Sequence, residues 1–168
     1  MEWDFLVRAL GRWVHICSGT FWVGMLGYLN LVQYPMLKRK AGGVMGLVDQ
    51  PIISRVLTIM KWSALLCWLM GLGILGGEIK DVIWFKGHLF FYPIAIGFWL
   101  GTLMLASIWL MMYPCYRCFS SNLPMAESKK RKAKKRFIFV LRANFFLMFL
   151  LMFLMVASGG IFRAPLPF

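Results

Sequence analysis

Four apolar stretches, each long enough to cross a lipid bilayer, dominate this chain of 168 residues. A membrane-spanning helix needs about 20 predominantly apolar residues, and the stretches occupy residues 12–31, 56–76, 89–113 and 137–159. Hydrophobic residues make up 61% of the chain, which is more than an ordinary soluble domain contains. The sequence therefore predicts an all-α integral membrane protein in which residues 1–168 form one domain, a bundle of four transmembrane helices.

Basic residues are concentrated on one side of this predicted bundle. The first and third connections lie on the same side of the membrane in a four-helix topology. Because cytoplasmic loops carry the excess of Lys and Arg, these two connections are predicted to be cytoplasmic and both termini to be outside, in the periplasm if the cell is Gram-negative. The acidic N-terminal segment, with Glu2 and Asp4, is not typical of a cleavable signal peptide. In a bacterial cell this topology corresponds to the bacterial cytoplasmic (inner) membrane. Of the 19 basic residues, 14 belong to the predicted cytoplasmic side: Lys38, Arg39, Lys40, Arg55, Lys61, Arg117, Lys129, Lys130, Arg131, Lys132, Lys134, Lys135, Arg136 and Arg142.

The densest basic run, "KKRKAKKR" at residues 129–136, is predicted to lie in the third connection. A cluster of this kind next to a membrane span binds anionic lipid headgroups and fixes topology. An acidic surface of a protein partner is the second interpretation, and nucleic acid is a distant third, so no nucleic-acid partner is predicted. The residues assigned to lipid contact are Lys129, Lys130, Arg131, Lys132, Lys134, Lys135 and Arg136.

The two histidines of the chain, His15 and His88, are predicted at the same membrane face. The first and third helices both begin outside, and each histidine lies near the start of its helix. Two neutral imidazoles on facing helices are what a bis-histidine haem b requires. The alternative is that both are interfacial residues bonded to backbone or water.

Five polar residues are predicted to form a cluster toward the cytoplasmic side: Asn30, Gln33, Lys61, Arg142 and Asn144. Lys61 and Arg142 lie a short way inside their helix ends, where they can extend to the headgroups or pair with polar neighbours. No carboxylate occurs inside any predicted span, which argues against a proton relay built on acids.

The cysteines and glycines are assigned structural roles. Cys115 and Cys118 form "CYRC", but a structural zinc site needs four ligands and no second Cys/His pair completes one, so no metal site is predicted. Glycines recur at helical spacing in the first three spans, including Gly19, Gly24 and Gly71, and predict close helix packing.

Several motifs resemble the urate oxidase N-terminal family, the membrane domain of bacterial cytochrome-c-linked urate hydroxylases, which also occurs as short stand-alone proteins. "RWVHICSGTFWVGMLGYLNLVQYP" resembles the first helix of that family, and "MKWSALLCWLMGL" resembles the Trp-Phe-Arg-Trp-Gly-Ala entrance to its second helix, with Lys61 where arginine is usual. "GTLMLASIWLMMYP" is similar to a segment of the third helix. "LRANFFLMFLLMFLMVAS" is similar to the Ser-Arg-x-Asn opening of the final helix. The resemblance therefore touches all four predicted spans.

The chain departs from the family at two points. Ser107 stands where the family has asparagine, and Cys115, Tyr116 and Arg117 follow the position of the family's Trp-Pro. The chain also contains no Cys-x-x-Cys-His motif for a covalent haem.

The resemblance leaves three hypotheses of function. The first is an accessory, non-catalytic or structural subunit of a larger membrane-bound redox complex, which is not an enzyme on its own. The alternative is a haem b-binding electron-transfer protein, or a urate hydroxylase-like oxidoreductase, that works with a separate cytochrome c through His15 and His88. The third is a copper-handling membrane protein, for which ligands are few. No residue is assigned a catalytic role.

Overall fold

The computed structural model describes residues 2–35, 51–85, 91–120 and 126–157, and almost all of these residues are helical. The elements are α1 (Glu2–Gly27), η1 (Tyr28–Gln33), α3 (Pro51–Leu75), η3 (Gly76–Glu78), α4 (Ile79–Ile83), α5 (Phe91–Ser107), η4 (Ile108–Met112), α6 (Tyr113–Ser120) and α7 (Glu127–Val156). The predicted all-α class is confirmed. His88, Lys38, Arg39, Lys40 and the outermost residues of two predicted spans, 89–90 and 158–159, lie outside the described residues.

Three helical segments of the described part are long and apolar enough to cross a membrane: Ile52–Leu75, Tyr92–Cys118 and Glu127–Val156. They contain most of the second, third and fourth predicted stretches, so the chain is an α-helical protein with three candidate spans. The first predicted stretch lies in α1 and η1. These elements are long enough, but Arg8, Arg12, His15 and Ser18 make them less apolar than the other three.

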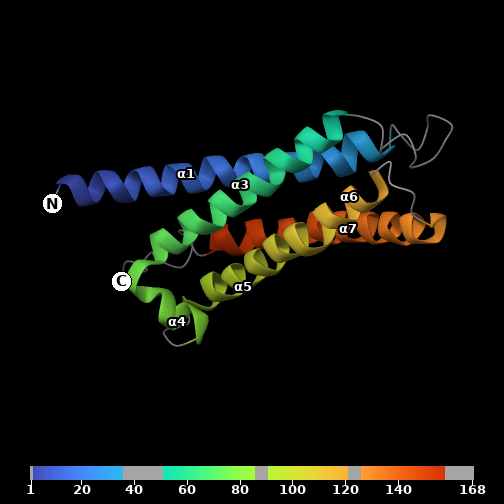
Figure 1. The fold of residues 1–168 in the computed structure, drawn as a ribbon. Coiled ribbons are helices and arrows are strands. Elements are labelled where there is room, and N and C mark those ends of the chain that lie inside the picture. Colours follow the sequence, from blue (N-terminus) through green and yellow to red (C-terminus); the bar gives the residue numbers. More distant parts are fainter. Residues whose placement is uncertain (1, 36–50, 86–90, 121–125, 158–168) are drawn as a thin grey trace.

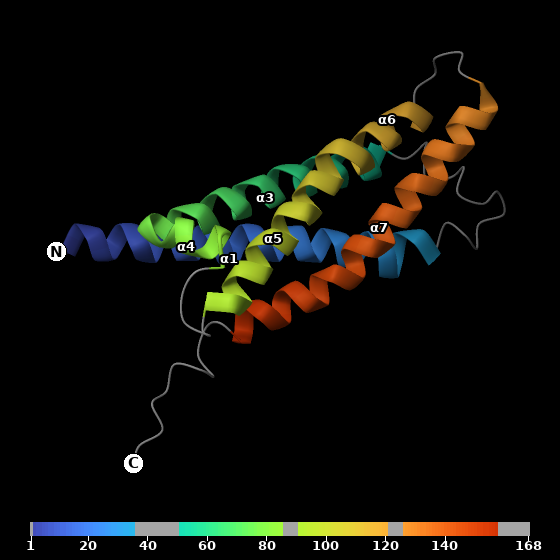
Figure 2. The ribbon, with the colours of Figure 1, turned by 90° about the horizontal axis from the view of Figure 1, so that it is seen from below.

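The helices pack as two pairs (Figures 1 and 2). α1 and α3 lie side by side, and the continuous rod formed by α5, η4 and α6 packs against α7. α1 ends, α3 begins, α6 ends and α7 begins at the same end of the bundle. The first turns of α1 extend beyond the neighbouring helices at the other end, where Leu6, Val7 and Leu10 are exposed. The core between the pairs contains fully buried aliphatic and methionine side chains, among them Leu26, Leu57, Met60, Met104 and Ile108.

Two π-helical turns, η1 and η4, lie in corresponding positions. Each is followed directly by a Tyr-Pro dipeptide, Tyr34–Pro35 after η1 and Tyr113–Pro114 after η4. Proline lacks a backbone N–H, and its ring clashes with the carbonyl four residues earlier in a regular α-helix. A π turn just before the proline widens the helix and relieves that clash. The turn in the α5–α6 rod therefore lets the helix continue through Pro114, and the turn after α1 lets Pro35, the last described residue of its segment, take a helical position.

The predicted location of the basic run in a connection is wrong. Residues 129–136 belong to the first turns of α7, which begins at Glu127 and continues without interruption into the apolar segment. Lys, Arg and Ala favour helix, no Gly or Pro intervenes between Glu127 and Val156, and Glu127 in the first turn complements the helix dipole. The run is therefore a cationic helical extension of the last candidate span.

The glycines contribute to packing at some positions only. A Cβ at Gly19 would lie 3.3 Å from Cys67 Sγ, and a Cβ at Gly71 would lie 3.2 Å from His15 Cε1. Gly19 and Gly71 therefore let α1 and α3 approach each other closely. At Gly24 a Cβ would meet nothing within 4 Å, so this glycine has no such role within the described chain.

Candidate functional site: histidine, asparagine and lysine contacts in the bundle

His15 lies on the face of α1 that contacts α3. Its Nδ1 lies 2.8 Å from the carbonyl oxygen of Cys67 and 3.6 Å from the Sγ of the same residue. A carbonyl only accepts hydrogen bonds, so Nδ1 carries the proton in this contact. In the neutral imidazole, Nε2 then keeps its lone pair and is free to accept a hydrogen bond or to coordinate a metal. Metal-ligating histidines commonly donate their other N–H to a carbonyl in this way.

The partner predicted for His15 is His88, which lies outside the described residues. The structure therefore gives no distance between the two rings. Within the described ranges, no group of three or more His, Cys, Asp and Glu side chains is placed to hold a metal ion. What the structure establishes at His15 is a contact between helices whose space is provided by Gly71.

Asn144 on α7 is the most deeply buried member of the predicted polar cluster. Only 2% of its surface is exposed. Its Nδ2 donates to Ser107 Oγ at 2.7 Å and to the Val140 carbonyl at 2.9 Å, and the Ser107 hydroxyl donates to the Met104 carbonyl at 2.7 Å. Asn144 Oδ1 has no hydrogen-bond partner among the described residues. This contact joins α7 to the last residue of α5, directly before η4.

Asn30 and Gln33 lie in η1. Asn30 Nδ2 donates to the Leu26 carbonyl at 2.9 Å and reaches across to the Leu141 carbonyl on α7 at 3.4 Å. Gln33 is buried, and its Oε1 accepts a hydrogen bond of 2.8 Å from the Tyr28 hydroxyl. Asn30 therefore links helices, as α7 passes beside the π turn.

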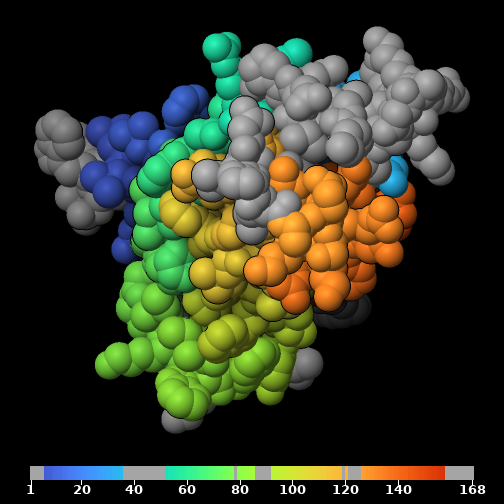
Figure 3. Space-filling view, turned by 45° about the vertical axis from the view of Figure 1, so that its right-hand side comes forward, coloured from blue at the N-terminus to red at the C-terminus, as the bar shows by residue number. Residues whose placement is uncertain are grey.

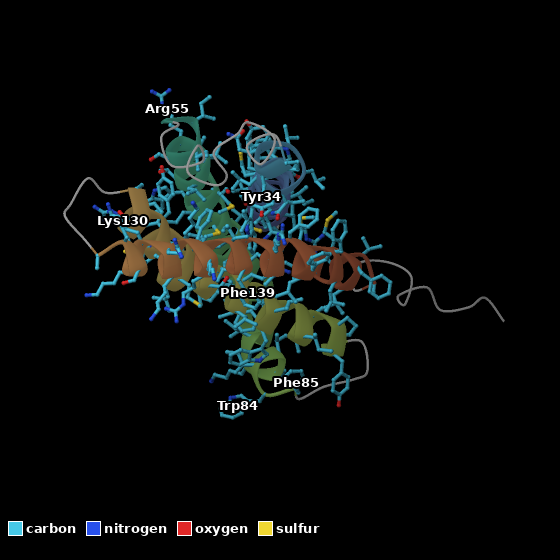
Figure 4. All side chains as sticks on the ribbon, turned by 90° about the vertical axis from the view of Figure 1, so that its right-hand side faces the viewer. Tyr34, Arg55, Trp84, Phe85, Lys130 and Phe139 are labelled. Carbon is cyan, nitrogen blue, oxygen red and sulfur yellow. The ribbon has the colours of Figure 1, made fainter. Side chains whose placement is uncertain are left out.

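Arg142, one residue beyond Leu141, lies against η1 as well. Its guanidinium carbon is 4.8 Å from the centroid of the Tyr34 ring, within the range of a cation–π contact. Figure 4 shows Tyr34 beside α7. The side chain of Arg142 is exposed, which is consistent with a cation extending from the edge of an apolar segment.

Lys61 is surrounded by three aromatic rings. Its Nζ lies 4.1 Å from the ring centroid of Tyr113, 4.5 Å from that of Trp109 and 5.1 Å from that of Trp62. The two indoles contact each other edge-to-face, with centroids 5.4 Å apart. An ammonium in an apolar helix costs about 2.5–3.5 kcal/mol, and each cation–π contact returns about 0.5–2 kcal/mol. The three rings therefore offset much of the cost of this charge.

The five predicted residues thus form separate contacts instead of one cluster. Lys61 contacts the α5–α6 rod, Asn144 contacts Ser107, Gln33 bonds to Tyr28 within η1, and Asn30 and Arg142 lie at the contact between η1 and α7. The aromatic partners Tyr34, Trp109 and Tyr113 were not predicted. A partial signal in the sequence was the Tyr-Pro pair, which follows both π turns and supplies both tyrosines, although a third copy, Tyr92–Pro93, lies at the start of α5 without a π turn.

The cationic residues gather at the end of the bundle where α3 and α7 begin. In the first turns of α7, Lys129, Arg131 and Lys132 are exposed, and Arg55 is exposed near the start of α3. Figure 4, a view toward this end, shows Arg55 and Lys130 at its periphery. The opposite end carries α4, with Lys80 and Asp81 both exposed.

A comparison with protein-family models, curated proteins and solved structures finds no match for this chain. The resemblance to the urate oxidase N-terminal family therefore stays a prediction.

Proposed function

We propose that the chain is an accessory subunit of a larger membrane-bound redox complex, with α1 as a fourth span beside the three candidate spans. The observation that supports this proposal is the outer face of α1. Trp13, Ile16 and Phe21 are exposed there, next to the exposed small residues Thr20 and Gly24. Small residues flanked by large apolar ones are typical of contacts between membrane helices.

The lower hydropathy of α1 fits the same interpretation. A helix that carries exposed Arg8 and Arg12 is better suited to a protein neighbour than to lipid on all sides. One face of α1 packs against α3, whereas the face that carries Trp13, Ile16 and Phe21 is exposed in the described part of the chain. The redox part of the proposal comes from the family resemblance of the four motifs.

Replacing Gly24 with Leu tests the subunit role. In native membranes solubilised in mild detergent, the wild-type chain is expected in an assembly larger than itself on a blue-native gel. Gly24→Leu adds a large side chain to the exposed face that carries Thr20 and Phe21, so it should block a close helix contact there and shift the chain to a smaller form on the gel. Gly73→Leu is the matched control, since Gly73 is also exposed with nothing within 4 Å of a Cβ but lies on α3.

Two outcomes contradict this proposal. One is a wild-type chain that migrates alone in native membranes. The other is a Gly24→Leu chain that remains in the larger assembly as fully as the Gly73→Leu chain.

The orientation belongs to the proposal as well. The cationic start of α7 lies at anionic headgroups on the cytoplasmic side, and both termini lie outside, in a bacterial cytoplasmic membrane. The support is the shared end of the bundle at which α1 ends, α3 and α7 begin and the basic residues gather.

Labelling of an introduced cysteine checks this orientation. In a background with the four native cysteines replaced by serine, Lys132→Cys should resist a membrane-impermeant maleimide in intact cells and react after permeabilisation. Lys80→Cys, at the opposite end of the bundle, should react in intact cells. Rapid labelling of Lys132→Cys in intact cells would reverse the orientation.

A second candidate function is haem b binding with electron exchange to a separate cytochrome c. The specific observation that favours it is the contact between His15 Nδ1 and the Cys67 carbonyl, which leaves Nε2 as the ligating nitrogen. His88 would supply the second axial ligand.

An absorption spectrum of the dithionite-reduced protein tests this candidate. If haem b is bound, the spectrum shows a reduced b-type band that His15→Ala and His88→Ala each abolish, while size-exclusion chromatography shows an assembled protein. Absence of the band from wild type purified out of haem-replete cells would contradict it, and so would its retention in both variants.

A further inference from the structure

Lys61 and its three aromatic neighbours, Trp62, Trp109 and Tyr113, form what we call the Lys61 cluster. Trp62 comes from α3 like Lys61, whereas Trp109 and Tyr113 come from η4 and α6. These two parts of the chain lie next to each other on the face of the molecule shown in Figure 3, α3 in green and the α5–α6 rod in gold. The cluster is therefore built across a contact between helices and depends on the π turn that positions Trp109.

The positive charge of the cluster has no carboxylate near it in the sequence. No Asp or Glu occurs in residues 51–77 or 91–120, the two helical segments that form the cluster, or in residues 128–157 of α7. Aromatic faces attract a cation through their quadrupole but carry no net charge. The rings stabilise the ammonium, and its charge remains unneutralised within the helices that form the cluster.

A second hydrogen-bond donor lies in the same cluster. Trp109 Nε1 is buried, and it has no hydrogen-bond partner among the described residues. An indole N–H is a donor only, and so is an ammonium group. Both groups therefore call for the same kind of partner, one that accepts hydrogen bonds, and an anion would satisfy both.

The cluster is exposed at the Trp62 ring, whereas Trp109 Nε1 has less than 1 Å² of exposed surface, so an anion reaches that N–H only when a neighbouring side chain shifts. Trp62 is 54% exposed, and its ring is the most distant of the three from Lys61 Nζ. Lys61 follows the start of α3 by ten residues, about 15 Å of helix. Its closest ring, Tyr113, is the one nearest the end of the α5–α6 rod. The ammonium thus extends toward the end of the bundle where the cationic residues gather, as a long side chain does when it reaches for the headgroup region.

We propose that the Lys61 cluster binds an oxyanion, a phosphate or carboxylate group, held by the Lys61 ammonium and the Trp109 N–H beside the exposed Trp62 ring. Two sources could supply this group, the headgroup of an anionic lipid and a soluble anion. This site is independent of the subunit role and of haem, because it shares no residue with the outer face of α1 or with His15.

Thermal unfolding of the full-length protein in detergent tests the proposal. The soluble arm titrates inorganic phosphate and benzoate. The lipid arm titrates dihexanoyl-phosphatidylglycerol, with zwitterionic dihexanoyl-phosphatidylcholine as the control for the acyl chains. In one arm the midpoint of unfolding should rise and saturate. Lys61→Gln should weaken that binding at least about tenfold, since a hydrogen bond to a charged group is lost.

Three further variants sharpen the result. Lys61→Arg keeps the charge and should keep the binding, and Trp109→Phe keeps the ring but loses the N–H and should weaken binding several-fold. Lys80→Gln removes an exposed lysine at the opposite end and should leave the binding unchanged. If Lys61→Gln fails to fold, Trp109→Phe carries the test.

The two arms separate the sources. Saturation with phosphatidylglycerol alone assigns a lipid headgroup, and saturation with phosphate or benzoate assigns a soluble anion. The proposal is overturned if neither arm saturates, if Lys61→Gln binds like the wild type, or if Trp109→Phe does.

Discussion

The hydrogen bond from Asn144 to Ser107 connects the two halves of the hairpin formed by the α5–α6 rod and α7, inside a core that is mostly apolar. In an apolar medium without water, a buried amide must find its partners within the protein. Asn144 is satisfied at Nδ2 only when α7 and α5 hold one register. Asn30 and His15 act in the same way on the other helices, through the carbonyls of Leu141 and Cys67. These few polar contacts fix the register of the helices relative to one another, which apolar packing alone specifies less strictly.

The two π turns connect these hydrogen bonds to the aromatic contacts of Lys61 and Arg142. η4 begins directly after Ser107, so the bond that fixes Ser107 also fixes where Trp109 and Tyr113 meet Lys61. η1 has the corresponding role on the other side, where Tyr34 follows the turn and receives Arg142. Both cations of the apolar segments thus face rings that come from or directly follow a π turn. The proline after each turn is the covalent reason that the helix widens there.

Hydropathy predicted the all-helical class and three helices that are long and apolar enough to cross a membrane, because apolar length alone decides those. Hydropathy marked residue 137 as the start of the last apolar segment, but the helix itself begins ten residues earlier, at Glu127. The reason is that Lys, Arg and Ala favour helix about as well as Leu does. Depth along a helix led to the prediction that Asn30, Gln33, Lys61, Arg142 and Asn144 form one polar cluster toward the cytoplasmic side. It could not predict that they face different neighbours, because that depends on the rotation of each helix and on the π turns that shift it.

A double-mutant cycle of Asn144→Ala and Ser107→Ala, measured as free energy of unfolding in detergent or bicelles, tests most directly whether buried polar contacts hold the helices together. Such pairs in membrane proteins couple by about 0.6 kcal/mol on average and at most about 1.7 kcal/mol. We expect a coupling in that range. Ser63→Ala, which removes only a bond to the Met60 carbonyl on its own helix, should show no coupling to Asn144→Ala. Strict additivity of Asn144→Ala and Ser107→Ala would contradict the account.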